Sequence, residues 1–193
     1  MPTNSEQLLL TLRRIGIKRI FAGSATAAAL IEPLLANRTA ADQSGLQLHT
    51  TDASHVAINM AQGYFRASGT MAAVLLDARQ LADDSLPGCR LASTHRTPML
   101  ILLRDPEHRT TAFLSGSKWS KSLHIDQSIA PLVSRAAAIA RSEPAAPVCL
   151  NLPDAIMKAH ASSESAEFSV VRDIAPDPDS VSEVASALIA AEF

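Results

Sequence analysis

Three apolar runs of strand length constrain the fold of this chain more than any other feature of its sequence. They cover residues 70–76, 98–103 and 147–152, and each is nearly continuous in apolar residues rather than alternating. Strands of this kind are typically buried on both faces, as in parallel sheets. Helical patterns separate the runs, and such alternation builds a parallel sheet with helices on both faces. The sequence therefore predicts a doubly wound α/β domain.

Capping and turn residues place the remaining elements of the domain. Thr3 and Glu6 form a capping box that begins a first helix, and Gly16 ends it. Two shorter strands and four further helices are expected from apolar periodicity. The strands are residues 17–21 and 46–49, and the helices are residues 27–36, residues 52–69, a segment ending near residue 93, and residues 127–140.

The composition changes after residue 157, where a Ser-, Ala- and Glu-rich stretch reads as a linker. A final helix follows, and Ser180 with Glu183 is expected to begin it as a second capping box. Three apolar residues line one side of this helix: Val181, Val184 and Leu188. We therefore expect a domain over residues 1–157 and a linker with a C-terminal helical arm over residues 158–193, the arm docking on the domain or on a partner.

Charge and cysteine content argue against several classes of function. The chain has 193 residues, a net charge of −2 and no Lys/Arg-rich run, so neither nucleic acid nor an anionic membrane is an expected partner. No apolar run approaches the roughly 20 residues that span a bilayer, and the N-terminus lacks a signal-type segment. Cys89 and Cys149 stand far apart without metal-ligand spacing, which favours a reduced, cytoplasmic protein and no metal site.

Residues 52–69 carry the most informative pattern in the chain. They indicate one helix of about four turns, with Thr51 or Asp52 as its N-cap and Gly69 at its C-terminal end. Five residues recur at helical spacing and are expected to form the core-facing stripe: Val56, Ala57, Met60, Ala61 and Tyr64.

The same helix carries apolar residues away from that stripe. Ile58 and Phe65 lie beyond it, which predicts a second covered side. Gly63 lacks a Cβ and would permit close approach of another backbone. We therefore expect the chain to self-associate or to bind a partner through helix 54–68.

This segment resembles a sequence typical of the pyrimidine-binding (PYR) domain of thiamine diphosphate-dependent enzymes of the acetolactate synthase and pyruvate decarboxylase type. The family segment reads H-E-x-x-A-x-x-x-A-x-G-Y-x-R-x-x-G. Six residues of this chain fall in register with it: Ala57, Ala61, Gly63, Tyr64, Arg66 and Gly69. The family's glutamate, which protonates the aminopyrimidine of the cofactor, aligns with Ser54.

The resemblance extends from about residue 4 to about residue 157 through segments that keep the family order. The run "TPMLILL" is similar to the family's S-I-P-V-L-V-I, "SKW" to T-K-W, and residues 147–154 to G-P-V-x-L-x-x-P-x-D. Two turns depart from the family pattern. The turn after the first strand lacks F-G-x-P-G, and Asp77 and Arg79 put charges where the family has a G-P-G turn.

The resemblance implies thiamine diphosphate as the cofactor and assigns candidate residues to it. The implied cofactor-binding residues are Gly23, Ser24, Ala25, Ser54, Ala78 and Arg79. The candidate catalytic position is Ser54, for which Asp52 or His55 are possible substitutes as proton-transfer groups. The chain lacks the G-D-G…N motif of the family's PP domain, so the resemblance implies that a PP-domain-containing partner holds Mg²⁺ and the diphosphate.

Three functions stay open at this point. The chain could be the PYR subunit of a split decarboxylase or carboligase acting on a 2-oxo acid, comparable to the small subunit of sulfopyruvate decarboxylase. It could be a degenerate PYR subunit that supports or regulates an active partner. It could also be an unrelated α/β domain that binds a small ligand at the carboxyl ends of its strands.

Overall fold

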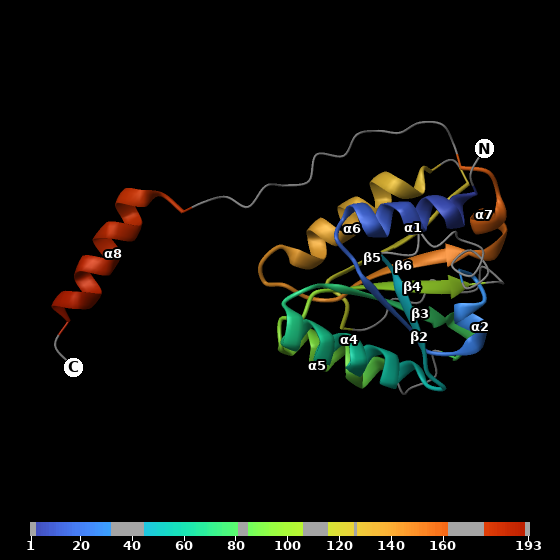
Figure 1. The fold of residues 1–193 in the computed structure, drawn as a ribbon, viewed down its shortest axis with the longest axis horizontal. Coiled ribbons are helices and arrows are strands. Elements are labelled where there is room, and N and C mark those ends of the chain that lie inside the picture. Colours follow the sequence, from blue (N-terminus) through green and yellow to red (C-terminus); the bar gives the residue numbers. More distant parts are fainter. Residues whose placement is uncertain are drawn as a thin grey trace.

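The computed structural model of the chain describes residues 3–31, 45–80, 85–105, 116–125, 127–161 and 176–191. Its centre is a six-stranded sheet in the order β2-β1-β3-β4-β6-β5, and all neighbouring strands are parallel (Figure 1). The strands are β1 (Arg19–Ala22), β2 (Gln47–Thr50), β3 (Ala72–Asp77), β4 (Met99–Asp105), β5 (Trp119–Ser122) and β6 (Val148–Pro153). The predicted doubly wound α/β fold is confirmed.

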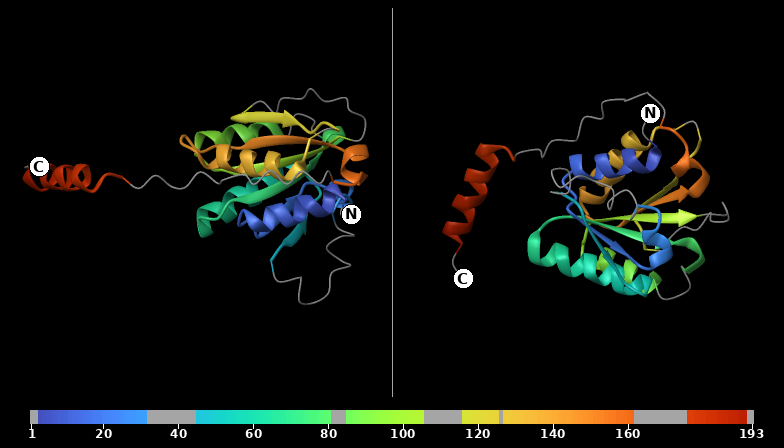
Figure 2. Two further views of the ribbon diagram at one scale, coloured as in Figure 1. Left: turned by 90° about the horizontal axis from the view of Figure 1, so that it is seen from above. Right: turned by 45° about the vertical axis from the view of Figure 1, so that its right-hand side comes forward.

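Helices cover both faces of the sheet. Their bounds are α1 (Asn4–Arg14), α2 (Ala25–Ala28), α4 (Ser54–Ser68), α5 (Ser85–Thr94), α6 (Ile129–Arg141), α7 (Asp154–Lys158) and α8 (Pro178–Ala190), with a 3₁₀ turn η1 (Ala78–Gln80). Helices α1 and α6 lie side by side on one face, and α4 and α5 lie on the other (Figures 1 and 2).

The three apolar runs form the central strands, and every residue of β3 and β6 is buried. Side chains alternate between the two cores, as a pleated strand requires. On β3, Ala73 and Leu75 belong to the core under α1 and α6, whereas Val74 and Leu76 belong to the core under α4 and α5. Burial of apolar side chains on both faces, at about 1.5–3 kcal/mol for each large one, is the main contribution holding the layers together.

The N-terminal helix closes the domain. The predicted capping box is confirmed, since Thr3 Oγ1 accepts from the Glu6 N–H at 3.3 Å and Glu6 Oε2 accepts from the Thr3 N–H at 2.7 Å. The buried Asn4 Nδ2 donates to the carbonyl of Ile156 at 2.9 Å. Residues at the two ends of the packed domain are therefore bonded to each other.

Helix α4 contradicts the predicted stripe in part. Ala57 and Ala61 are buried as expected, but Val56 and Met60 are exposed by 37% and 38%. Ile58, which was expected at an outer face, is fully buried against α5. The reason is that α4 packs on two neighbours, and alanines allow it to lie close to the sheet while Ile58 fills the space at α5.

The ends of the helices were predicted with mixed success. Gly69 ends α4 in the left-handed region, with φ 66°, as expected. The N-cap of α4 is Ala53, without a side-chain bond, so the prediction of Thr51 or Asp52 was wrong. Thr51 Oγ1 instead donates toward the carbonyls of Ala22 and Ala53. Helix α2 ends at Ala28, and the rest of its predicted length lies largely outside the described residues.

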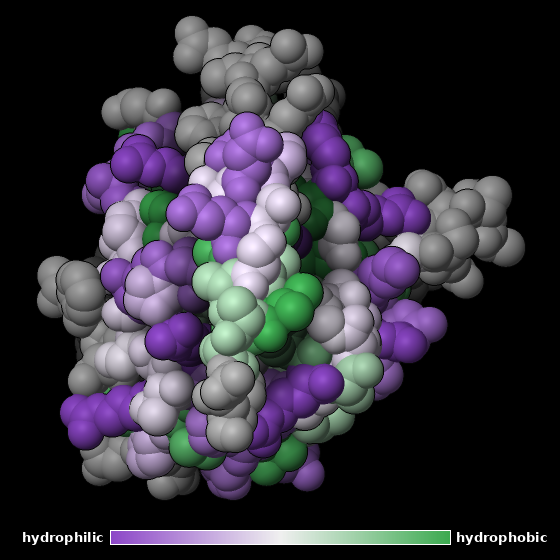
Figure 3. All heavy atoms as spheres, turned by 90° about the vertical axis from the view of Figure 1, so that its left-hand side faces the viewer, coloured by the Kyte–Doolittle hydropathy of each residue, from purple (hydrophilic) through white to green (hydrophobic). Residues whose placement is uncertain are grey.

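The C-terminal helix α8 buries none of its residues. Its N-cap is Asp177, which accepts from the Ser180 N–H at 3.1 Å, so the predicted capping box of Ser180 with Glu183 was wrong. Figure 3 faces the end of the molecule that carries α8, where apolar side chains lie on the outer surface. Among the described residues, no helix has the length and apolar character needed to cross a bilayer.

Candidate functional site

The candidate site lies beyond the carboxyl ends of the parallel strands, where ligands of such sheets bind. Because the strands run in one direction, the turns that follow β1, β2, β3 and β6 meet at one edge of the sheet. Those turns, together with the start of α4, contain every residue that the sequence predicted for cofactor binding or catalysis. The predicted edge is therefore formed, and the question becomes which side chains face one another there.

Gly23 and Ser54 bring the first two turns into contact. A Cβ atom at Gly23 would lie 2.8 Å from Ser54 Cα and 3.1 Å from Ser54 Oγ. Glycine at this position is therefore a requirement of packing between the β1–α2 turn and the start of α4. The Gly23 N–H donates to the carbonyl of Leu75 at 2.9 Å, which fixes the turn on β3.

The β1–α2 turn is a capped helix start. Ser24 is buried and is the N-cap of α2, because its Oγ accepts from the Ala27 N–H at 3.1 Å. Ala25 is exposed, so it presents backbone and a methyl group to solvent at this edge. The Ser24 hydroxyl is thus engaged in folding the turn.

The three candidate catalytic residues differ in their surroundings. Ser54 is the first residue of α4 and is 6% exposed, and its hydroxyl makes no hydrogen bond within the described part of the chain. His55 is half-buried, and its Nδ1 is buried without a partner among the described residues. Asp52 is exposed. Ser54 and His55 are therefore the two candidates with an available polar group in enclosed surroundings, and Ser54 is the more buried residue of the two.

Asp77 and Arg79 form a closed turn after β3. The Asp77 side chain is fully buried and its carboxylate accepts from the Arg79 backbone N–H at 2.9 Å, from Nε at 3.2 Å and from Nη2 at 3.0 Å. Burial would raise the pKa of Asp77, but the hydrogen bonds and charge of Arg79, with the charge of Arg104, lower it below its usual value. Asp77 is therefore an ionised structural group at neutral pH. Ala78, between them, is half-buried.

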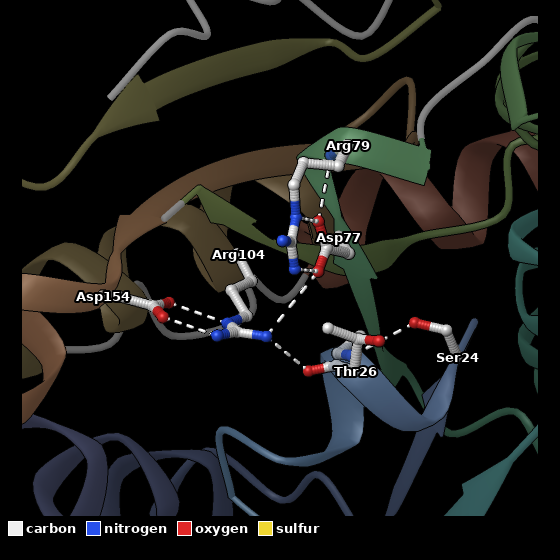
Figure 4. Close-up of polar contacts among 7 residues, drawn as sticks. Ser24, Thr26, Asp77, Arg79, Arg104 and Asp154 are labelled. Atoms are coloured by element: carbon white, nitrogen blue, oxygen red, sulfur yellow. Dashed lines mark hydrogen bonds and ion pairs between the residues drawn. The ribbon is translucent and has the colours of Figure 1, made fainter. Parts of the chain in front are cut away.

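Arg104 links this turn to the neighbouring segments (Figure 4). Its Nε and Nη2 donate to the two carboxylate oxygens of Asp154 at 2.8 and 2.6 Å. Its Nη1 donates to the Thr26 carbonyl at 2.7 Å and lies 3.6 Å from Asp77 Oδ2. The hydrogen bond with Asp154 raises the pKa of Arg104, outweighing the effect of burial.

The sequence did not predict the pairing of Arg104 with Asp154. The two residues are 50 positions apart, and the register of β4 with β6, which pairs Arg104 with Leu152, brings them together. The one signal in the sequence is that each charged residue closely follows a buried apolar run. The described residues hold no group of three or more His, Cys, Asp or Glu side chains suited to a metal ion.

Comparisons with known proteins agree with this geometry. The family model for the thiamine pyrophosphate enzyme N-terminal TPP binding domain matches residues 2–128. No curated protein sequence matches the chain. The structure is similar to benzoylformate decarboxylase from Polynucleobacter necessarius, with a TM-score of 0.72, 19% identity and coverage of 100% of this chain and 37% of that chain.

It is also similar to the thiamine diphosphate-dependent 4-hydroxybenzoylformate decarboxylase of Rhodococcus jostii RHA1, with a TM-score of 0.74 and 18% identity. That match covers 97% of this chain and 37% of that chain. The chain thus spans well under half the length of both proteins, and at these identities the likeness establishes the fold. The match of the family model over most of the chain shows that the chain belongs to the N-terminal, pyrimidine-binding domains of thiamine pyrophosphate enzymes.

Proposed function

We propose that this chain supplies the pyrimidine-binding half of a thiamine diphosphate-dependent decarboxylase or carboligase acting on a 2-oxo acid. The complementary PP domain, with Mg²⁺ and the diphosphate site, comes from a partner. The substrate class is supported by the two similar structures, which are named for benzoylformate and 4-hydroxybenzoylformate, both 2-oxo acids. When bound, the cofactor would supply the carbanion-stabilising chemistry that breaking the bond beside the keto carbon requires.

The observation that carries the proposal is the enclosed hydroxyl of Ser54 beside Gly23. Ser54 stands where the resembled family has its glutamate, and glycine at position 23 lets the β1–α2 turn lie directly against the start of α4 and the Ser54 hydroxyl. The residues present therefore fit the binding of a polar ring by the Ser54 hydroxyl and the backbone of the β1–α2 turn. We assign Gly23, Ser24, Ala25, Ser54 and Ala78 to this role, with Arg79 at its border.

The same residues fit proton transfer less well. A serine hydroxyl donates and accepts hydrogen bonds, but it holds no negative charge at neutral pH. A positioned acid or base contributes typically 10²–10⁴-fold to a rate. In an active assembly, either this contribution is missing or a second group supplies it. His55 is the stronger substitute, because it adjoins Ser54 and its buried Nδ1 has no hydrogen-bond partner within the described ranges.

A second candidate function is a PYR subunit that supports a partner without doing chemistry. The observation that favours it is the turn after β3, where Asp77 and Arg79 are bound to each other and to Arg104. The charged groups of this turn are used in internal ion pairs. In that case the domain would be retained for its contribution to the assembly.

The partner surface that we propose is the exposed face of α4. Val56, Met60, Gly63 and Ala67 follow one another at helical spacing and are exposed, and nothing in the described chain lies within 4 Å of a Cβ at Gly63. Ile58 was expected to contact a partner, but it is buried within the domain, so we propose this face as the contact surface instead. These four residues are uncharged, and Val56 and Met60 are apolar, as residues in the buried core of an interface typically are.

Binding of the pyrimidine half of the cofactor can be tested on the full chain with millimolar thiamine. We expect ¹⁵N-HSQC shifts at the amides of Gly23, Ala25 and Ser54, and we expect Ser54→Ala to weaken them. Ser68→Ala, at the far end of the same helix, is the matched control. Shifts confined to other regions, or unchanged in Ser54→Ala, would remove this site from consideration.

Catalysis is tested in the complex that co-purifies with the full chain, loaded with Mg²⁺ and thiamine diphosphate. If the site takes part in proton transfer, Ser54→Glu should accelerate exchange of the C2 proton of the cofactor, and His55→Gln should slow it. If neither variant changes exchange while the fold is retained, the supporting role is correct and the catalytic role is refuted.

The proposed surface is tested by the sizing-column profile of the full chain with its partner. Met60→Asp should release the chain from the assembly while its circular dichroism stays unchanged. Leu10→Asp is the matched control, since Leu10 is exposed by 46% and lies on α1, across the sheet from α4. Retention of the assembly in Met60→Asp would refute the surface.

A further inference from the structure

We propose that Arg104 is a positioning residue of the candidate site, which fixes the β1–α2 turn and binds no ligand itself. The relevance of that turn to a ligand rests on the proposed function, whereas the positioning role rests on the contacts of Arg104 alone.

One guanidinium joins three segments that are distant in sequence. Its contacts reach the Thr26 carbonyl in α2, the Asp77 carboxylate at the end of β3 and the Asp154 carboxylate at the start of α7. Figure 4 shows Arg104 between Asp154 and Thr26, with Asp77 above it. Helix α2, which follows the turn that contains Gly23 and Ser24, is therefore tied to the ends of β3 and β6.

Asp154 determines the direction in which Arg104 points. A bidentate pair of hydrogen bonds to a carboxylate fixes the plane of the guanidinium as well as its distance from the carboxylate. With Nε and Nη2 on Asp154, the remaining nitrogen, Nη1, is directed at Thr26. The side chains of Arg104 and Asp154 are 16% and 14% exposed, so solvent competes little for these bonds.

The same contacts argue against a ligand-binding role for Arg104. All three of its nitrogens have an acceptor in the protein, and two carboxylates offset its single charge. The acid group of a ligand would have to displace one of these carboxylates and leave it buried beside a like charge, which is unfavourable. The contribution of Arg104 is consequently to the shape of the site.

The turn needs this external support because α2 is short. It comprises four residues, so it has few hydrogen bonds of its own and depends on bonds from outside. The Ser24 side chain caps the amino end by accepting from the Ala27 N–H, the Gly23 N–H holds the preceding turn on β3, and Arg104 adds a bond at the Thr26 carbonyl. Loss of Arg104 should loosen α2, and with it the placement of Gly23 against Ser54.

The test is amide hydrogen exchange, measured by NMR on the full chain carrying Arg104→Gln. Hydrogen bonds of charged groups predict exchange of the Ala27 and Ala28 amides that is faster by roughly ten- to hundredfold. Arg141→Gln is the matched control, because Arg141 Nη2 also donates to a carbonyl at 2.7 Å, that of Ile15. That variant should affect amides next to Ile15 and leave those of α2 unchanged.

Asp154→Asn provides a milder second variant, which keeps the arginine and removes its charged partner. It should speed exchange of the same α2 amides by a smaller factor than Arg104→Gln. Exchange of the α2 amides within twofold of wild type in both variants would overturn the proposal, and so would an equal effect of Arg141→Gln on them. If exchange of the α2 amides is faster in these variants but the wild-type chain shows no chemical-shift changes with thiamine, the positioning role is upheld and the proposed function is refuted.

Discussion

The contact between the β1–α2 turn and helix α4 predicts that one methyl group added at Gly23 destabilises the domain. That methyl carbon would lie 2.8 Å from Ser54 Cα and 2.9 Å from Leu76 Cδ2, closer than carbon atoms pack. Ser54 Cα belongs to the backbone of α4 and cannot rotate away. Overpacking of a core by one such group costs about 1–3 kcal/mol, so Gly23→Ala should lower the free energy of unfolding by that amount.

Gly63→Ala should have the opposite effect and raise the free energy of unfolding. Gly63 lies within α4, is exposed and has no atom within 4 Å of a Cβ position. Alanine is favoured over glycine in a helix interior by about 0.8–1.0 kcal/mol. Both variants replace one glycine by alanine, yet they should differ in unfolding free energy by about 2–4 kcal/mol.

Urea denaturation of both variants, followed by far-ultraviolet circular dichroism, measures the difference. The dependence of the free energy on urea should stay that of wild type, because neither change alters the surface exposed on unfolding. Equal stability of Gly23→Ala and wild type would refute the described contact. A loss of stability in Gly63→Ala at low protein concentration would refute the open space at that residue.

Three further outcomes are expected. Folding lowers the pKa of Asp77, so its ionised carboxylate stabilises the fold above the unfolded pKa, and this stabilisation is lost as the pH falls through the folded pKa. In unfolding experiments at different pH values, Asp77→Asn should therefore reduce the loss of stability at acidic pH. Burial raises the pKa of Cys89 to about 12 and that of Cys149 further, so iodoacetamide at pH 8 should label both only after unfolding. Lys118 Nζ donates to the Ser142 carbonyl at 2.7 Å and to neighbouring carbonyls at the end of α6, so Lys118→Met should cost about 1 kcal/mol in thermal or urea unfolding.

The fold was predictable because its central strands carry an unambiguous pattern. Strands buried on both faces are nearly continuous in apolar residues, and the short length of these runs favours strands over buried helices. Strand β5 (Trp119–Ser122) was missed for the same physical reason. It lies at the edge of the sheet and is only partly covered, so its serines and lysine show no apolar run.

Helix α4 shows where periodicity stops being informative. Its pattern predicts a core-facing stripe and a second covered side, and the element that covers the second side at Ile58 is α5 of the same chain and not a partner. Ile58 packs against Gly88 of α5, with its Cγ2 3.1 Å from a Cβ position there. Whether Ile58 or Met60 is the buried residue depends on Gly88, which lies in another helix. The sequence of α4 alone therefore cannot decide it.

The chemistry of the site depends on which carboxylate is available, and this the sequence could not decide. The chain lacks an acid at Ser54 but has one at Asp77, on the same edge of the sheet. Counting charges would suggest that Asp77 compensates for the missing glutamate. The structure argues otherwise, because two arginines neutralise Asp77 and lower its pKa, which makes it a poor proton acceptor at neutral pH. A carboxylate restored at position 54, facing the backbone of Gly23, is therefore a different group in chemical terms, and adding it tests the site in a way that altering Asp77 does not.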